Sequence, residues 1–444
     1  MDTNLILEKL KIEGLNAMQE AVSDAVLHSD KDIVVLSPTG TGKTLAYLLP
    51  LVSQLDGKSD ELQVVVLVPG RELALQSANV FKDMCNGCRA LALYGGRSAM
   101  DEHRLIKTVR PHIVFVTPGR LNDHLDKGNI SPECVHTLVI DEFDKCLAVG
   151  FQNEMNAAIG KLPNVSRHIL LSATDAEMIP HFVHLGRTQR IDYLLDDEQT
   201  SERVSIFTLR SRQKDKLETL KQLLLTLGAQ STMVFLNYRD SVERTGAYLS
   251  QQGFCTSAFH GGLEQKQRED ALYKFSNGSA NIFVSTDLGS RGLDIPDIDN
   301  IIHYHLPETE DAYIHRVGRT ARWNKEGRAY FILGPDEHLP EYVKAKLEEI
   351  PLECVENDAK QAQIPVPRMV TLYIGKGKKD KISKGDIVGF LCKKGGLQSG
   401  EIGKIDVKER YCYVAIARER LNQVLRQTQG EKIKGVKTLC ELVK

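Results

Sequence analysis

Residues 37–44 combine small, glycine-rich and cationic side chains in an order suited to holding phosphate groups. They read Ser-Pro-Thr-Gly-Thr-Gly-Lys-Thr and lie between the β-branched run Ile33–Leu36 and the apolar segment Leu45–Leu49. A glycine-rich turn between a strand and a helix directs backbone N–H groups and the positive helix terminus at phosphate oxygens. We therefore expect the whole loop to bind a nucleotide, through Ser37, Pro38, Thr39, Gly40, Thr41, Gly42, Lys43 and Thr44.

Four side chains would carry the chemistry at that nucleotide. Lys43 can reach the β- and γ-phosphates, and the Thr44 hydroxyl can bind Mg²⁺. Asp141 and Glu142 follow the apolar run Leu138–Ile140, and the carboxyl ends of parallel strands border the crevice where such sheets bind ligands. Asp141 fits a second Mg²⁺ ligand, and Glu142 fits the base that activates the attacking water. A nucleotide with a γ-phosphate, together with Mg²⁺, is therefore the expected ligand of this site.

The elements that must position these residues alternate short apolar runs with longer stretches of helical spacing. Up to about residue 195 the runs fit buried parallel strands, namely Ile33–Leu36, Val64–Val68, Ile113–Val116, Leu138–Ile140 and His168–Leu171. A second series comprises Met233–Leu236, Ile282–Ser285, Ile301–Tyr304 and Ala329–Leu333. Such alternation predicts two doubly wound α/β domains, at residues 1–196 and 203–352, with a polar linker at 196–202.

The last part of the chain has a different order of elements. The segment Glu356–Pro367 ends in Ile-Pro-Val-Pro, which favours an extended linker. Residues 368–444 then predict a small α+β domain of βαββαβ order, with strands at Val370–Ile374, Ile402–Val407, Tyr411–Ile416 and Val436–Glu441 and helices at Lys384–Lys393 and Glu419–Gln427.

Charge is distributed unevenly along the chain. Residues 368–444 contain 18 Lys and Arg against 8 Asp and Glu, a net charge of +10, whereas residues 1–367 carry −12 and the whole chain only −2. A large acidic body with a small basic tail suggests a polyanionic partner for the tail. A purely solubilising basic domain is the alternative.

A longer set of motifs resembles the DEAD-box RNA helicases of superfamily 2 over nearly the whole chain. The name-giving tetrapeptide reads Asp141-Glu142-Phe143-Asp144. The other matching elements are Pro69-Gly70-Arg71-Glu72-Leu73-Ala74, Gly95-Gly96, Thr117-Pro118-Gly119-Arg120, Ser172-Ala173-Thr174, Gln265-Lys266-Gln267-Arg268, residues 286–294 (TDLGSRGLD) and residues 315–322 (HRVGRTAR). The resemblance implies an α/β fold of two RecA-like parallel-sheet P-loop domains, followed by the α+β RNA-binding domain.

The resemblance also implies roles for single residues. Gln19 resembles the glutamine that reads adenine, Asp294 would touch the ribose, and Arg319 and Arg322 would reach the γ-phosphate. Ser172 and Thr174 would couple hydrolysis to duplex opening. The implied RNA contacts are Arg71, Gly96, Thr117, Gly119 and Arg120 in the first domain and Gln265, Arg268 and Thr286 in the second.

The tail resembles the C-terminal domain of DbpA-type helicases, an RNA-recognition-motif-like domain. Tyr411 and Tyr413 stand on one face of a strand, where RNA bases could stack on them. Packing or pairing across strands is the alternative for these two tyrosines. Lys378 and Lys379 belong to a lysine cluster that would neutralise phosphates. The resemblance implies a structured ribosomal RNA target.

Other features of composition narrow the setting. No apolar run approaches the ~18 residues that span a bilayer, and Met1–Lys9 lacks the pattern of a secretory signal. Nine cysteines stand without a paired pattern, as expected of thiols kept reduced. We expect a cytoplasmic monomer with no membrane partner.

These observations predict an ATP-dependent RNA helicase that locally remodels structured RNA, with ribosomal RNA in large-subunit assembly as its expected target. The alternative is an RNA-binding assembly factor or clamp with little unwinding activity. Departures from the family pattern at Ser37, Gly70, Phe143 and Ala321 keep that alternative open.

Overall fold

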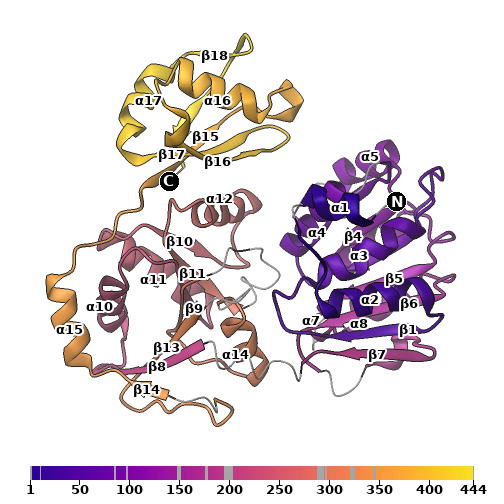
Figure 1. Ribbon diagram of the computed structural model, residues 1–444, viewed down its shortest axis with the longest axis horizontal. Coiled ribbons are helices and arrows are strands. Elements are labelled where there is room, and N and C mark those ends of the chain that lie inside the picture. Colours follow the sequence, from indigo (N-terminus) through magenta and orange to yellow (C-terminus); the bar gives the residue numbers. More distant parts are fainter. Residues whose placement is uncertain are drawn as a thin grey trace. The chain divides into compact units, whose positions relative to one another are not determined.

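The computed structural model describes residues 3–10, 12–84, 87–96, 99–147, 152–175, 179–194, 204–287, 295, 298–320, 326–343 and 347–443. The chain forms two compact units, residues 1–202 with 291–294 and residues 203–290 with 295–444. Each unit contains a seven-stranded parallel sheet, and the second unit also contains the C-terminal domain (Figure 1). None of the described helices is long and apolar enough to cross a membrane.

The first sheet has the strand order β3-β4-β2-β5-β6-β1-β7. Its strands are β1 (Asp32–Leu36), β2 (Val64–Leu67), β3 (Ala90–Leu93), β4 (Ile113–Val116), β5 (Thr137–Asp141), β6 (Arg167–Ser172) and β7 (Thr188–Asp192). Helices cover both faces, so alternate side chains of β1 enter two different cores: Ile33 and Val35 join one, Val34 and Leu36 the other. Burial on both faces explains why the central strands are continuous apolar runs.

The described helices of this unit either precede β1 or lie between successive strands, and they complete its two cores. They are α1 (Thr3–Leu10), α2 (Ala17–His28), α3 (Lys43–Gln54), α4 (Arg71–Met84), α5 (Ala99–Val109), α6 (Pro118–Asp126), α7 (Phe143–Cys146) and α8 (Gln152–Ile159). In α4, Leu73, Ala74, Ser77, Ala78 and Phe81 are buried. That spacing of three and four residues is the apolar stripe of an amphipathic helix.

The second sheet has the order β10-β11-β9-β12-β13-β8-β14. Its strands are β8 (Val204–Arg210), β9 (Thr232–Leu236), β10 (Thr256–Phe259), β11 (Ile282–Thr286), β12 (Asn300–His303), β13 (Gly327–Leu333) and β14 (Leu347–Glu349). The helices between them include α10 (Leu217–Leu227), α11 (Arg239–Gln251), α12 (Gln265–Ser276) and α14 (Glu310–Val317). The two sheets therefore share one topology, and the expected fold class is confirmed.

Every strand that the apolar runs predicted is present, but both sheets are wider than predicted. The strands that were missed are β3, β7, β8, β10 and β14, and all but β8 lie at a sheet edge. Edge strands are covered less fully, so their sequences need not be continuously apolar. β7 reads Thr-Gln-Arg-Ile-Asp, with one buried residue in five.

The C-terminal domain is an antiparallel sheet in the order β16-β17-β15-β20, with two helices on one face (Figure 1). Its elements are β15 (Met369–Ile374), α16 (Lys384–Lys393), β16 (Ile402–Val407), β17 (Cys412–Ala417), α17 (Leu421–Thr428), β18 (Lys432–Ile433), β19 (Val436–Lys437) and β20 (Cys440–Leu442). The predicted last strand is divided, because β18 and β19 form a separate hairpin before β20. Alternate residues of β15 and β17, such as Leu372 and Val414, pack against the helices.

The two predicted linkers differ in outcome. The first, residues 196–202, lies outside the described residues. The second is wrong in its first half, because α15 (Leu352–Gln361) extends well into the segment Glu356–Pro367. Val355 and Ala359 are buried one helical turn apart on α15, and this packing outweighs the proline-rich end of the segment.

Candidate functional site

The glycine-rich loop joins β1 to α3, as the sequence predicted. Gly40 and Gly42 adopt φ of 85° and 84°, a left-handed backbone that other residues rarely adopt. The hydroxyl of Ser37, which stands where the family pattern has glycine or alanine, donates to Thr41 Oγ1 at 2.8 Å. The departure at this position is thus accommodated by a hydrogen bond inside the loop.

Gln19 lies directly against the loop. Its side chain is 3% exposed, and its Nε2 donates to the carbonyls of Thr41 and Gly42 at 3.5 and 3.4 Å. Asn16, the N-cap of α2, donates to the same Thr41 carbonyl at 3.0 Å. A side chain at position 42 would collide with the Gln19 amide, so this glycine is required by close approach as well as by its backbone conformation.

Lys43 begins α3 and is buried. Its ammonium donates to the carbonyls of Ser37 at 2.5 Å and Pro38 at 2.8 Å. Burial lowers the pKa of this lysine to about 8, although Asp141 and Glu142 oppose the shift. The loop, the lysine and the two carboxylates therefore form one electrostatically linked group.

Asp141 ends β5, and its carboxylate is buried. Burial, together with the neighbouring Glu142, raises its pKa to about 6. The backbone N–H of Glu142 donates to Asp141 Oδ1 at 3.0 Å, and the Tyr47 hydroxyl donates to Oδ2 at 3.4 Å. Sequence reasoning missed Tyr47, which no motif singles out and whose place on α3 brings it to the end of β5.

Glu142 adopts a left-handed backbone with φ of 52° and ψ of 52°. This conformation is uncommon for residues other than glycine, and it marks positions that the surrounding structure enforces. Lys145, one turn along, is 5% exposed and places its Nζ 2.8 Å from Glu142 Oε2. Sequence reasoning missed Lys145, although its spacing of three residues from the predicted base was visible.

The Ser172-Ala173-Thr174 element contacts the acidic tetrapeptide. The Thr174 hydroxyl donates to Asp144 Oδ2 at 3.2 Å, and the Thr174 N–H donates to Ser172 Oγ at 3.1 Å. Residues 30 positions apart are thus joined next to Glu142. A movement of residues 172–174 would therefore change the hydrogen bond to Asp144, and a movement of Asp144 would change it likewise.

Arg71 and Gly96 also lie together. A Cβ at Gly96 would lie 2.6 Å from Arg71 Nη1, and φ at Gly96 is 93°. The glycine therefore leaves room for a guanidinium at the start of α4. This pairing brings two of the predicted RNA contacts together.

The third element of the first unit that was predicted to contact RNA, Thr117–Arg120, lines part of a small cavity of about 270 Å³. Its lining comprises Gly95, Thr117, Pro118, Gly119, Arg120, Asp123 and Glu154. Gly95, of the glycine pair, and Arg120, of the Thr117–Arg120 element, therefore border the same cavity. One cation, Arg120, and two carboxylates, Asp123 and Glu154, line it, and Arg120 is paired with Asp123.

Glu102 is a buried anion behind this cavity that sequence reasoning missed. Its carboxylate is 1% exposed and lies 2.7 Å from Arg120 Nε and 3.0 Å from His124 Nε2. The N–H of Tyr94, next to the glycine pair, donates to its other oxygen at 3.3 Å. Glu102 thus links two of the predicted RNA-contacting elements. Its position in the polar helix α5 gave no sign of this burial.

In the second unit, Arg316 connects two motifs. It is 1% exposed and donates to both carboxylate oxygens of Asp287 at 2.6 and 2.7 Å. It also donates to Asn237 Oδ1 at 2.8 Å and to the His305 carbonyl at 2.7 Å. The motif at 315–322 is therefore anchored to the motif at 286–294 by a buried bidentate pair.

The remaining predicted residues of this unit have the following positions. Gln265 begins α12, and its amide donates to Glu269 at 3.2 Å. Arg268 is buried on the same helix, donates to the His260 carbonyl at 3.4 Å and lies over the Phe259 ring. Thr286 ends β11, and Arg319 follows α14; both are buried. Asp294 and Arg322 lie outside the described residues.

The two tail tyrosines lie on the sheet face opposite α16 and α17. Tyr413 is fully buried, and its hydroxyl donates to Asp270 of α12. The Tyr411 hydroxyl donates to Glu269 of the same helix. Lys378 and Lys379 are exposed in the first loop of the tail. Of the two interpretations of the tyrosines, the packing interpretation describes their contacts in this structure.

Three family models match consecutive parts of the chain. The DEAD/DEAH box helicase model matches residues 16–179, and the helicase conserved C-terminal domain model matches residues 215–324. The DbpA RNA binding domain model matches residues 371–442. The family resemblance that the motifs indicated is confirmed.

Two similar proteins span nearly the whole chain. ATP-dependent RNA helicase DbpA of Escherichia coli (strain K12) is 33% identical over 444 residues, which cover 99% of this chain and 96% of that protein. ATP-dependent RNA helicase DbpA of Bacillus subtilis (strain 168) is 30% identical over 465 residues, which cover 97% and 95%.

Solved structures share the fold of the two sheets. Saccharomyces cerevisiae Dbp5 bound to RNA and ADP BeF3 has a TM-score of 0.70 at 20% identity, over 81% of this chain and 95% of that one. DEAD-box helicase Mss116 bound to single-stranded RNA and UDP-BeF has a TM-score of 0.69 at 25% identity, over 81% and 80%. This chain therefore belongs to the DEAD-box ATP-dependent RNA helicases and ends in a DbpA RNA-binding domain.

Proposed function

We propose that this helicase uses Mg²⁺-bound ATP to open short duplexes in structured ribosomal RNA during assembly of the large ribosomal subunit. The activity class, an ATP-dependent RNA helicase, follows from the family. The observation that supports the finer proposal is the tail, which is a DbpA-type RNA-binding domain with a net charge of +10.

Within the nucleotide site we assign each role to a described side chain. Residues 37–42 hold the phosphates, and Lys43 exchanges its loop carbonyls for phosphate oxygens when ATP binds. The Thr44 hydroxyl and the Asp141 carboxylate are oxygen donors of the kind that Mg²⁺ prefers, so these residues fit the metal. The metal would neutralise charge on the β- and γ-phosphates.

Glu142 is the proposed general base. Its left-handed backbone and its pair with Lys145 fix the direction of the carboxylate. A base held in one orientation loses less entropy when it aligns a water with the γ-phosphate. Gln19, Asp294, Arg319 and Arg322 retain the roles that the family implies, as proposals.

For RNA, we propose that the backbone is held by Arg71, Gly96, Thr117, Gly119, Arg120, Gln265, Arg268 and Thr286. The lysines of the tail, with Lys378 and Lys379 among them, would hold a structured segment of the same RNA through its phosphates. Ser172 and Thr174 would transmit the state of the nucleotide, since Thr174 contacts Asp144. We further propose that the protein acts as a cytoplasmic monomer.

The test of this proposal compares RNA ligands at moderate salt. The full chain is mixed with ATP and Mg²⁺ and with either fragments of large-subunit ribosomal RNA or unrelated hairpins of equal length. We expect ribosomal fragments to stimulate ATP hydrolysis at lower concentrations. Equal stimulation by both sets would remove the ribosomal target and leave a general RNA helicase.

A further inference from the structure

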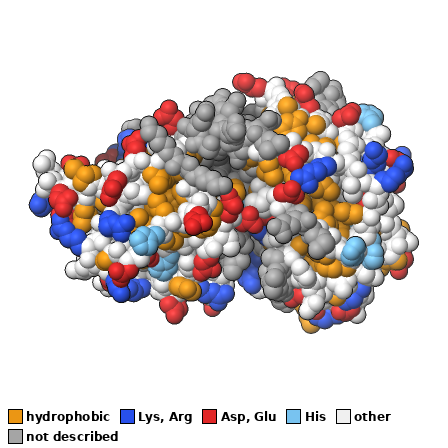
Figure 2. Space-filling model, turned by 90° about the horizontal axis from the view of Figure 1, so that it is seen from below, with side chains coloured by type: hydrophobic (Ala, Val, Ile, Leu, Met, Phe, Trp, Pro, Cys, Tyr) orange, Lys and Arg blue, Asp and Glu red, His pale blue; other side chains and the backbone are white. Residues whose placement is uncertain are grey.

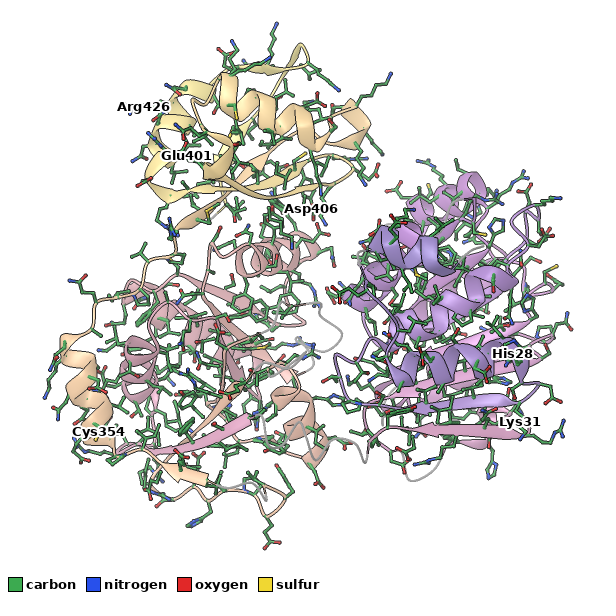
Figure 3. All side chains as sticks on the ribbon, in the orientation of Figure 1. His28, Lys31, Cys354, Glu401, Asp406 and Arg426 are labelled. Carbon is green, nitrogen blue, oxygen red and sulfur yellow. The ribbon has the colours of Figure 1, made fainter. Side chains whose placement is uncertain are left out.

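The sheet of the C-terminal domain is covered on both faces. Helices α16 and α17 pack on one face, and α12 of the neighbouring α/β domain lies along the other (Figure 1). Asp406, labelled in Figure 3, lies on β16 on the side of the tail towards α12, whereas Arg426 lies on the helical layer. The face on α12 is the one that carries the tail tyrosines.

The contacts to the tail come from one stripe of α12 and the turn after it. Lys266, Glu269, Asp270, Tyr273 and Ser276 recur at spacings of three and four residues, which places them on one side of a helix. The other side of α12 packs on its own domain, where Arg268 lies over Phe259 and Phe275 contacts Phe283. α12 is therefore an element shared between two layers.

The contact between α12 and the tail sheet, here called the junction, pairs carboxylates of α12 with tyrosine hydroxyls of the tail. Glu269 accepts from the Tyr411 hydroxyl and Asp270 from the Tyr413 hydroxyl. Burial raises the pKa of Asp270, and hydrogen bonding by a phenol compensates a carboxylate that is removed from water. Two anionic side chains directed at this face would also repel RNA phosphates.

Aromatic and cationic contacts fill the space between these pairs. The rings of Tyr273 and Tyr413 stack at 4.9 Å between centroids, and the Tyr273 hydroxyl donates to the Lys404 carbonyl at 2.5 Å. Lys266 Nζ lies 4.7 Å from the centroid of the Tyr373 ring. The rings of Tyr413 and Tyr373 are thus in contact with side chains of α12.

Further hydrogen bonds fix the register of the two layers. Asn277 Nδ2 donates to Thr371 Oγ1 at 2.8 Å, and Thr371 Oγ1 donates to Ser279 Oγ at 2.9 Å. Arg418 donates to the carbonyls of Pro367 at 2.7 Å and Ser279 at 3.4 Å. These bonds tie the linker, the sheet and the end of α12 together.

The exposed lysines of the tail gather elsewhere. Lys434, in the turn between β18 and β19, donates to the Lys381 carbonyl at 2.9 Å and pairs with Asp386 at 2.8 Å. These contacts join the first loop and the hairpin into one basic surface, whose exposed members are Lys378, Lys379, Lys381, Lys384, Lys432, Lys434 and Lys437. This surface remains accessible while the sheet is docked.

We propose that the aromatic face of the tail sheet is a docking surface for α12, and that RNA binds the docked tail through the basic surface. Gln265 and Arg268 lie on α12 itself, so docking holds RNA bound to the tail in a fixed direction relative to these two residues. This second step depends on their proposed role as RNA contacts. The docking itself does not depend on it.

The first experiment locks the junction. Asn277→Cys and Thr371→Cys are combined in the full chain, because their side chains meet in the docked state. The crosslinked peptide is identified by mass spectrometry, and the same sample after reduction is the control. Affinity is measured with a fluorescein-labelled RNA hairpin that carries a single-stranded extension.

We expect the crosslink to form and to change neither RNA affinity nor RNA-stimulated ATP hydrolysis by more than about twofold. Failure of the crosslink to form in a folded protein would overturn the docking. A loss of RNA affinity of about tenfold or more that is reversed by reduction would show that the sheet face must open for RNA, and would equally overturn the proposal. If RNA did not stimulate the unaltered chain, the proposed function would fail while the crosslink still reported docking.

The second experiment loosens the junction without removing a ring. Glu269→Gln and Asp270→Asn are combined, with Asp240→Asn, an exposed carboxylate on α11, as the matched control. We expect faster hydrogen exchange in β15 and β17, an unchanged Kd for the hairpin, and about a tenfold lower RNA-stimulated kcat/KM, since RNA on the tail no longer has a fixed direction. Binding that tightened fivefold or more would identify the freed face as an RNA surface and contradict the proposal.

Discussion

The two seven-stranded sheets arrange their strands in the same order, so that β1 corresponds to β8 and β5 corresponds to β12. After β1 the first sheet has the glycine-rich loop and Lys43. After β8 the second sheet has residues 211–216, Ser-Arg-Gln-Lys-Asp-Lys, which contain no glycine. One topology thus supports a phosphate-binding loop in one domain and an ordinary connection in the other.

Lys43 and Lys216 stand at corresponding places in the two sheets, but they bind different partners. Lys43 begins α3, and Lys216 immediately precedes α10; burial lowers the pKa of both. Lys216 donates to the Ile332 carbonyl at 2.9 Å and pairs with Glu337 at 2.7 Å. Lys43 bonds to carbonyls of its own loop, beside two carboxylates. The fold provides a buried cation at both places, and the loop decides whether it can serve a nucleotide.

The greatest change in activity is expected at Glu142, the proposed general base, which follows β5 of the first sheet. Glu142→Gln should lower kcat for ATP hydrolysis by roughly 10²–10⁴-fold, the usual contribution of a general base, and leave ATP and RNA binding intact. Steady-state hydrolysis and equilibrium binding of a fluorescent ATP analogue measure the two properties. Hydrolysis near the level of the unaltered chain would reject Glu142 as the base.

Alanine substitutions of Lys43 and Lys216 test whether the two lysines have different roles. Lys43→Ala should reduce ATP hydrolysis on the order of 10²-fold, as expected when a preorganised charge is removed from a phosphoryl-transfer site. Lys216→Ala should leave hydrolysis within about twofold and lower stability by about 1–3 kcal/mol, because buried partners lose a donor. Hydrolysis assays and thermal unfolding of both variants distinguish the roles, and equal losses of activity would contradict them.

A smaller effect is expected at Glu102, which lies behind the residues of the first unit that we propose to contact RNA. Glu102→Ala removes the carboxylate that holds Arg120 and should raise KM for RNA about tenfold, with kcat at saturating RNA within about twofold. Asp101→Ala, one residue earlier on α5 and exposed, is the control. A change in kcat with KM unaltered would mean that Glu102 acts on hydrolysis rather than on RNA.

The smallest effect is a pH dependence in the second sheet, at the strand end that corresponds to Asp141. Burial lowers the pKa of His305 to about 4, Lys216 and Arg316 add to the shift, and Glu337 opposes it. An unfolded histidine has a pKa of about 6.5. The unfolded chain therefore takes up the proton first, and stability that is complete above about pH 6.5 is lost as the pH falls towards 4.

Hydrogen exchange of β12 amides between pH 7.5 and 5 measures this loss. His305→Asn should flatten the dependence, because an amide oxygen can still accept from the Asn237 N–H without titrating. A slope unchanged by the substitution would assign the acid sensitivity to another group, such as the buried His303, whose pKa is also lowered by burial.

How much could be predicted from sequence differs between these regions. The central strands and the loop at 37–44 were predictable, because their signals are local runs of residues. Glu102, Lys145 and Tyr47 were not, because each acquires its importance from a partner on another turn or element. The edge strands were missed since partial cover allows polar residues such as those of β7.

The tail shows the same limit at a larger scale. Alternation along β17 correctly placed Tyr413 on the face away from the helices, but it could not reveal that α12 covers that face. The spatial distribution of charge also becomes visible only in the structure. Acidic and basic side chains are interspersed over the described surface shown in Figure 2. The lysines of the tail, in contrast, are brought together by a loop and a hairpin. Contacts between residues far apart in the sequence favour the packing interpretation of Tyr413, which the sequence alone left open.

ATP-dependent duplex opening is tested most directly by displacement of one strand of a short RNA duplex that carries a single-stranded extension. We expect the full chain to displace the strand with ATP and Mg²⁺ but not with ADP, and we expect Glu142→Gln to displace it for no more than a single turnover. RNA-stimulated ATP hydrolysis without strand displacement would contradict this expectation and favour a clamp. Equal displacement with ATP and with ADP would contradict it as well.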